Sequence, residues 1–161
     1  MARKEVWLTE LGANTTTQED EPGRIREEWD STLGTRRFRY VQVHATSAAV
    51  ANGTPMMMRN VAGTVVTTVI ADASRNQPAG VGRGVIAAGS FGWIQIYGEH
   101  TAVITNGDDD IADGDNIIYS ATAAQVDSVA AGTAPTFMRI GVAVAADVDA
   151  ANTVDTFLTL G

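Results

Sequence analysis

The chain has 161 residues, of which 45% are hydrophobic, and carries a formal net charge of −8. This length and hydrophobic content suffice for one folded domain with its own core, and they exclude a disordered chain. The absence of cysteine excludes disulfides and thiolate metal sites, and no apolar run approaches the ~18 residues of a membrane span.

The charges are unevenly distributed along the chain. Residues 1–40 hold 7 of the 11 basic and 8 of the 19 acidic residues, which leaves 4 basic and 11 acidic residues for the remainder. An acidic body of this kind repels phosphate backbones and anionic lipid surfaces. We therefore expect neither nucleic acid nor a membrane as a partner. Two roles stay open for the basic residues near the N-terminus: they complement the acidic body of another copy, or Glu27, Glu28 and Asp30 neutralise them locally.

Residues 1–36 are predicted to form a charged N-terminal arm. The polar run over residues 14–22 is too poor in apolar residues to fold by itself. Ile25, Trp29 and Leu33 follow at intervals of four residues, which predicts a short amphipathic helix over about residues 24–32. Two arrangements of the arm stay open: it packs back on its own domain, or it reaches across a neighbouring subunit.

From residue 37 onward the sequence predicts a series of short strands. They are rich in Val, Ile, Thr and aromatic residues, and most are bounded by Gly, Asn, Asp or Pro. The expected strands cover residues 37–44, 65–71, 84–88, 93–98, 101–105, 116–120, 138–145 and 156–161. With no helical period between them, they predict an all-β domain over residues 37–161, a β-barrel or β-sandwich of about eight strands.

The first strand, RFRYVQVH, changes its apolar face partway along. Phe38 and Tyr40 would lie on one face and Val41 and Val43 on the other. This predicts a strand that crosses between two environments, or one with a bulge near Tyr40.

Two further stretches of the body are expected to be structural. The triple Met at residues 56–58 favours a strand that fills gaps in the core. Residues 78–84, PAGVGRG, match neither glycine-rich phosphate-binding pattern, so we expect a flexible turn before the strand at residues 84–88.

The pair Glu99–His100 is the main candidate for catalysis. Gly98 ends one alternating run and the next begins at Thr101, which predicts a bend or bulge inside a continuing strand or hairpin. Catalysis would require a nucleophile and a group that orients the His, and Ser90 lacks the glycine two residues before it that a nucleophile elbow needs. We therefore expect a structural corner and no enzyme.

The stretch NGDDDIADGDN, residues 106–116, is the densest acidic segment of the chain. Counted from Asp109, an EF-hand loop would have Asp113 at position 5 and Gly114 at position 6, but position 3 is hydrophobic. Asp109, Asp113 and Asp115 are the candidate ligands of an irregular calcium site. The favoured interpretation is two polar turns with no bound metal, and we expect no cofactor.

Four segments of the body resemble a known family. They are built from small, β-forming and turn residues in the order RRFRYVQVHATSAAVANGTPM, GVIAAGSFGWIQIYGEHTAVI, DIADGDNIIYSATAAQV and RIGVAVAADVDAANTVDTFL. The first is similar to that family's "R-x-F/Y-R-Y-V" strand and the third to its "i-x-x-G-D-x-l-y-x-s" segment. The family is that of the capsid decoration, or cement, proteins of tailed bacteriophages, and the likeness covers about residues 37–161.

The resemblance implies a β-barrel or β-sandwich that clamps the outside of an icosahedral shell, often as a homotrimer at three-fold positions. The partners would be the major capsid protein and other copies of the chain. The protein would be made in the host cytoplasm and reside on the capsid exterior of the virion.

The arm supplies the candidate interface, because aromatic and Arg side chains carry most of the binding energy of protein interfaces. The residues chosen on this ground, with the apolar residues beside them, are Trp7, Leu8, Ile25, Trp29, Arg36, Arg37 and Arg39. The alternative function is a β-barrel binding module or a tail-associated protein that recognises a receptor or glycan, with or without calcium. Trp93 and Tyr97, expected on one strand face, would then make the contacts.

Overall fold

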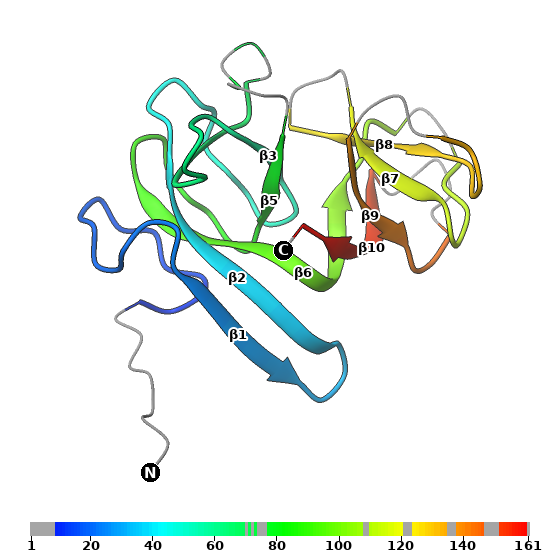
Figure 1. The fold of residues 1–161 in the computed structure, drawn as a ribbon, viewed down its shortest axis with the longest axis horizontal. Coiled ribbons are helices and arrows are strands. Elements are labelled where there is room, and N and C mark those ends of the chain that lie inside the picture. The colour runs from blue at the N-terminus through cyan, green and yellow to red at the C-terminus, as the bar shows by residue number, and fades with distance from the viewer. Residues whose placement is uncertain are drawn as a thin grey trace.

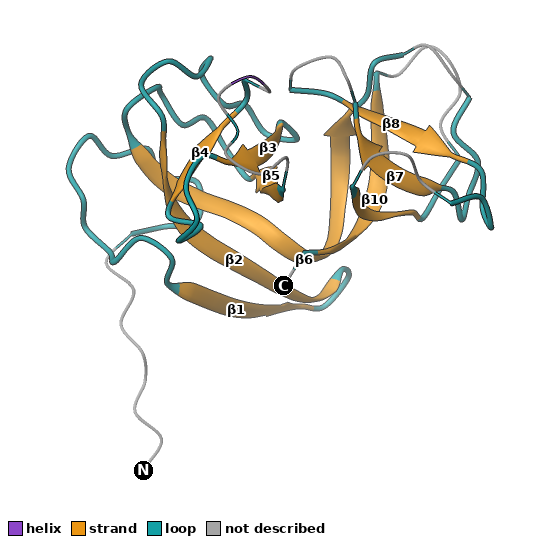
Figure 2. Cartoon of the chain, turned by 45° about the horizontal axis from the view of Figure 1, so that its top comes forward, coloured by secondary structure: helices purple, strands orange, loops and turns teal. Residues whose placement is uncertain are grey.

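The structure is a computed structural model that describes residues 9–69, 71, 73, 77–107, 110–120, 124–134, 138–146 and 152–160. It confirms the all-β prediction, with ten strands joined in one sheet (Figures 1 and 2). The strands are β1 (Ile25–Asp30), β2 (Gly34–Val43), β3 (Pro55–Met58), β4 (Val65–Thr67), β5 (Pro78–Gly82), β6 (Phe91–Ile104), β7 (Asn116–Tyr119), β8 (Val126–Val129), β9 (Arg139–Ala143) and β10 (Thr153–Thr159). Within the described ranges no helix is both long and apolar enough to cross a membrane.

The strand pairings form two circuits that share β6. The first ring runs β2–β4–β3–β5–β6 and closes where β6 pairs with β2. The second ring runs β6–β10–β9–β7–β8 and closes through a bridge between Thr105 and Val126. Figure 2 shows β6 passing from one half of the molecule to the other and turning sharply between them. Closing each ring pairs the edges of its strands. β1 pairs with β2 but belongs to neither ring.

Each ring surrounds its own apolar cluster. The first cluster takes residues from every strand of the first ring: Val41, Val43, Val50, Met56, Val66, Ala79, Ile86, Ile94 and Ile96. The second does the same for the second ring: Val81, Val103, Ile111, Ile117, Val126, Ile140, Ala143, Val154 and Leu158. Leu160 packs against both clusters, so the two halves are joined by side-chain packing as well as by β6.

A third, aromatic cluster lies on the opposite side of β2 and β6. It consists of the fully buried Phe38, Tyr40 and Trp93, with Leu11 and Phe91 packed against them. The prediction that the first strand crosses between two environments is confirmed, because Val41 and Val43 belong to the first cluster instead. The alternative, a bulge near Tyr40, is not found there: the register between β2 and β6 shifts between Arg37 and Phe38, where Ile96 of β6 is the extra residue.

The helix predicted over residues 24–32 is wrong, because this segment contains β1. Each residue of β1 has a partner in β2, from Ile25 opposite Arg39 to Asp30 opposite Gly34. A spacing of four residues is a multiple of the two-residue strand period, so Ile25 and Trp29 share a strand face as readily as a helix face. The expected domain boundary after residue 36 therefore lies inside β2.

The described part of the expected arm packs on its own domain. Trp93 donates a hydrogen bond from Nε1 to Thr9 Oγ1 at 2.9 Å, and Thr15 forms a β-bridge with Phe91. Of the two arrangements left open, residues 9–36 adopt the first. Trp7 and Leu8 lie outside the described residues.

The flexible turn expected at residues 78–84 is also wrong. Residues 78–82 form β5, and all five residues are buried. A Cβ atom at Gly82 would lie 2.4 Å from the carbonyl oxygen of Ala51, so this glycine permits close approach of two chain segments. The strand expected at residues 84–88 is reduced to one bridge between Ile86 and Val50.

Candidate interaction surface on the β1–β2 hairpin

β1 and β2 are joined by a turn that the Asp30 side chain stabilises. Its Oδ1 accepts backbone hydrogen bonds from Thr32 at 2.8 Å and from Leu33 at 3.0 Å, as Asp does in tight turns. These two bonds stabilise the carboxylate and lower the pKa of Asp30 below its ordinary value, and the nearby Arg36 acts in the same direction. The turn thereby fixes the register of the two strands.

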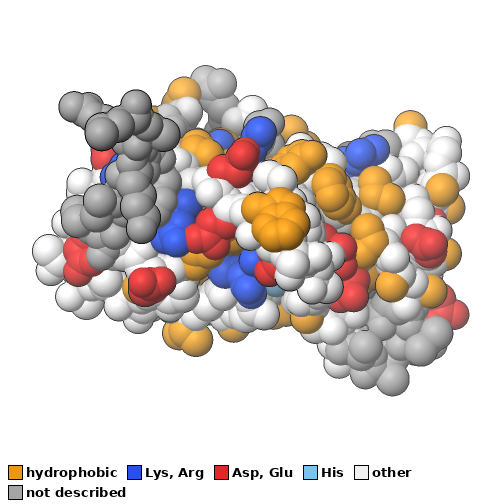
Figure 3. Space-filling view, turned by 90° about the horizontal axis from the view of Figure 1, so that it is seen from below, with side chains coloured by type: hydrophobic (Ala, Val, Ile, Leu, Met, Phe, Trp, Pro, Cys, Tyr) orange, Lys and Arg blue, Asp and Glu red, His pale blue; other side chains and the backbone are white. Residues whose placement is uncertain are grey.

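This register divides the hairpin into two faces. Antiparallel partners project to the same side of a sheet, so Ile25, Glu27 and Trp29 share a face with Arg37 and Arg39. We name this side the outer face. Its apolar members are exposed, Trp29 to 75% and Ile25 to 43%. Seen from below, acidic and basic side chains lie interspersed with hydrophobic ones on the side of the molecule that carries β1 (Figure 3).

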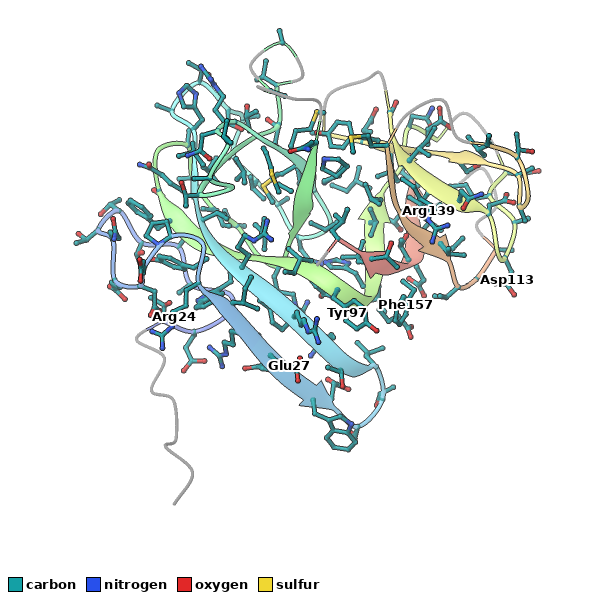
Figure 4. All side chains as sticks on the ribbon, viewed as in Figure 1. Arg24, Glu27, Tyr97, Asp113, Arg139 and Phe157 are labelled. Atoms are coloured by element: carbon teal, nitrogen blue, oxygen red, sulfur yellow. The ribbon has the colours of Figure 1, made fainter. Side chains whose placement is uncertain are left out.

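The outer face continues across β6 and β10 as a row of contacts. Arg37 donates from Nε to Glu27 Oε2 at 2.8 Å, and its guanidinium carbon lies 5.2 Å from the centre of the Tyr97 ring. Tyr97 in turn packs edge-on against Phe157, with ring centres 5.4 Å apart. Figure 4 shows Glu27 on β1, Tyr97 on β6 and Phe157 on β10, with β2 between β1 and β6. An ion pair flanked by half-buried aromatic rings is a composition typical of protein interfaces.

Two of the Arg residues chosen from the sequence are partly or wholly withdrawn from solvent. Arg36 lies on the inner face of the hairpin, 7% exposed, where it pairs with Asp30 at 3.1 Å and packs over the Phe38 ring. Arg39 is half-buried on the outer face, and burial lowers the pKa of its guanidinium. The exposed candidates that the structure brings together are therefore Ile25, Trp29 and Arg37.

Sequence reasoning did not assign Phe157 to this surface, and it placed Tyr97 on the wrong face. Tyr97 was expected beside Trp93, but Ile96 is an extra residue in β6, so Gln95 opposes Phe38 and Tyr97 opposes Arg37. Trp93 is fully buried, and the binding face of the alternative function is not formed.

The corner at Gly98, Glu99 and His100 lies within one continuous strand, which confirms the predicted bend. The bend is held by Gln95, whose Nε2 lies within hydrogen-bonding distance of the carbonyl oxygens of Tyr97, Gly98 and Glu99, at 3.3, 3.2 and 2.9 Å. At Gly98, φ is +88°.

His100 is buried beneath this bend. Its Nε2 lies 3.2 Å from the carbonyl oxygen of Gly82 and donates to it. Burial lowers the pKa of His100; the bond to Gly82 opposes this effect, and the cationic Arg83 and Arg36 reinforce it. These surroundings keep the imidazole neutral inside the fold.

In its described residues, the acidic segment uses a carboxylate to bind backbone amides in turns. Asp115 is buried, and its two carboxylate oxygens accept backbone hydrogen bonds from Ala112 and Ala131, both at 3.0 Å. Asp113 is exposed, and Asp109 lies outside the described residues. Across the described ranges, no three His, Cys, Asp or Glu side chains converge as a metal site would require.

Comparison of the chain with protein-family models, with curated proteins and with solved structures found no match.

Proposed function

We propose that this protein is a structural virion protein, a decoration protein that binds the outer surface of a phage capsid and stabilises it. The observation that carries the proposal is the outer face of the β1–β2 hairpin. There Ile25 and Trp29 are exposed on either side of Glu27, and the Glu27–Arg37 pair extends this face to Tyr97. Exposed aromatic and aliphatic side chains around an Arg are typical of protein-binding surfaces.

The rest of the molecule suits a protein displayed in many copies. Among the described residues, two rings pair most strand edges and so limit the open edges that cause aggregation, and a net charge of −8 favours solubility. The all-β fold agrees with what the resemblance over residues 37–161 implies. Weak contacts made by one hairpin become effective when many copies bind one shell.

The proposal predicts that Trp29 is required for capsid binding. We expect Trp29→Ser to weaken binding to shells assembled without this protein roughly tenfold or more, since central aromatic residues dominate interface energy. The measurement is the amount of protein that sediments with purified shells over a range of concentrations.

Met138→Ser is the matched control, because Met138 is 47% exposed beside the first residue of β9, a strand of the second ring, which includes neither β1 nor β2. It should bind like the unaltered protein. A Trp29→Ser variant that saturates shells normally would contradict the assignment of the surface. Failure of the unaltered protein to bind shells would contradict the function.

A further inference from the structure

β1 is an edge strand whose free side can be read from its hydrogen bonds. Tyr40 N donates to Arg24 O at 3.0 Å, so the even-numbered residues of β1 form the hydrogen-bonded pairs with β2. The N–H and C=O groups of Ile25, Glu27 and Trp29 then point away from β2. Among the described residues, β2 is the strand that pairs with β1, so this edge is available to another chain.

We propose that this edge pairs with β1 of a second copy, antiparallel, around a two-fold axis at Glu27. Only residues whose backbone groups point outward can pair across the new edge. In the register centred on Glu27, Ile25 of each copy lies opposite Trp29 of the other. Both Ile25–Trp29 pairs fall on the outer face, where they cover the most exposed apolar side chain among the described residues.

The charges of β1 select this register over its neighbours. On the inner face, Arg26 already pairs with Glu28 of its own chain, and in this register it also lies opposite Glu28 of the other copy, so the two ion pairs form one network of alternating charge. The two Glu27 side chains meet at the axis, where each is paired with Arg37 of its own chain. A shift that centres the axis on Arg26 would oppose two Arg, and one that centres it on Glu28 would oppose two Glu.

This charge pattern distinguishes β1 from an edge that is merely protected. Charged residues on an edge strand normally prevent pairing with unrelated strands. Here the sequence Ile-Arg-Glu-Glu-Trp is complementary to its own reverse in one register, so it excludes other strands while it admits a second copy. The inference concerns self-association in solution and does not rest on the proposed capsid partner. Because the dimer covers Trp29, self-pairing and the proposed capsid contact compete for the same face.

The test uses a proline substitution in the purified full chain, without shells. Glu27→Pro removes an outward N–H and leaves the bonds to β2 in place, because proline is tolerated where an edge strand faces solvent. Sedimentation equilibrium of the unaltered protein should show a concentration-dependent species of twice the monomer mass, and Glu27→Pro should remain monomeric. Glu27→Ala, which keeps the N–H, is the control and should still dimerise.

Hydrogen exchange of the unaltered protein gives a second readout that needs no variant. The Glu27 amide should exchange quickly in dilute solution and at least tenfold more slowly at concentrations where the dimer forms. The Glu28 amide, bonded to β2, should be protected throughout. A chain that stays monomeric at millimolar concentration, or a dimer in which Glu27 exchanges as fast as in the monomer, would overturn the proposal.

Discussion

Gly98 is the residue at which β6 turns from the first ring into the second. Its backbone φ of +88° is one that residues with a side chain rarely adopt, and a Cβ atom there would lie 2.4 Å from the carbonyl oxygen of Thr35. We expect Gly98→Ala to lower the free energy of unfolding by about 3 kcal/mol or more, since backbone strain and a backbone clash add. Denaturant titration measures this change.

Gly114 provides the comparison, because it has the same φ of +88° with open space around its Cβ position. Gly114→Ala should cost only the strain, about 1–2 kcal/mol. Equal costs for the two variants would show that the close approach to Thr35 is unimportant.

His100 should make the fold sensitive to mild acid. Burial lowers the pKa of His100 in the folded chain below the ordinary value of 6.5. As the pH falls below 6.5, the unfolded chain takes up a proton that the folded chain does not, so stability decreases. We expect the free energy of unfolding to fall between pH 7.5 and pH 5, a range above the one in which Asp30 titrates.

His100→Gln should flatten this part of the pH profile. His44→Asn is the comparison, because it removes a histidine from a partly exposed site beside Thr46. An unchanged slope in His100→Gln would contradict this role for the buried imidazole.

At the scale of strands, the sequence predicts elements where local pattern suffices and fails where distant contacts decide. The alternating runs at residues 93–98 and 101–105 are correctly predicted as strand, and they join into β6. Residues 25–30 are misread because one spacing fits both a helix and a strand. Residues 78–82 are misread because the glycines of β5 serve close packing against other segments, which no local pattern reveals.

The residues of the candidate surface also fall into two groups, those that residue type indicates and those that only contacts between strands reveal. Ile25, Trp29 and Arg37 could be chosen from residue type alone, and the register of β1 with β2 brings them to one face. Tyr97 and Phe157 join them only because an extra residue in β6 and the pairing of β10 place them there. These depend on contacts between strands far apart in sequence, so the sequence alone did not predict them.

The N-terminal segment is expected to be required for folding. Removal of residues 1–33 would delete β1 and expose the aromatic cluster, since Thr9 bonds Trp93 and Leu11 packs beside it. We expect a loss of several kcal/mol, enough to unfold a domain of ordinary stability. Circular dichroism of the truncated chain measures this loss. An unchanged melting temperature in the truncated chain would contradict this prediction and show that residues 9–33 are not needed for the fold.

At the scale of the whole molecule, two small rings share the long strand β6, and β1 is left outside both rings. Each ring buries one apolar cluster, and the aromatic cluster is buried on the other side of β2 and β6. The β1–β2 hairpin carries Trp29, which is the most exposed large apolar side chain of the described residues. A rigid body with one exposed contact element can bind a surface without any internal motion. The proposed capsid-binding role rests on this arrangement, in which the rings form the stable body and the hairpin supplies the contact.

The proposed decoration role is tested most directly by counting the copies of this protein in purified phage particles. Quantitative mass spectrometry against the major shell protein gives this ratio. The account predicts a ratio near one copy per shell subunit, or a fixed small fraction set by the shell symmetry. A handful of copies per particle, or none, would contradict a decoration protein.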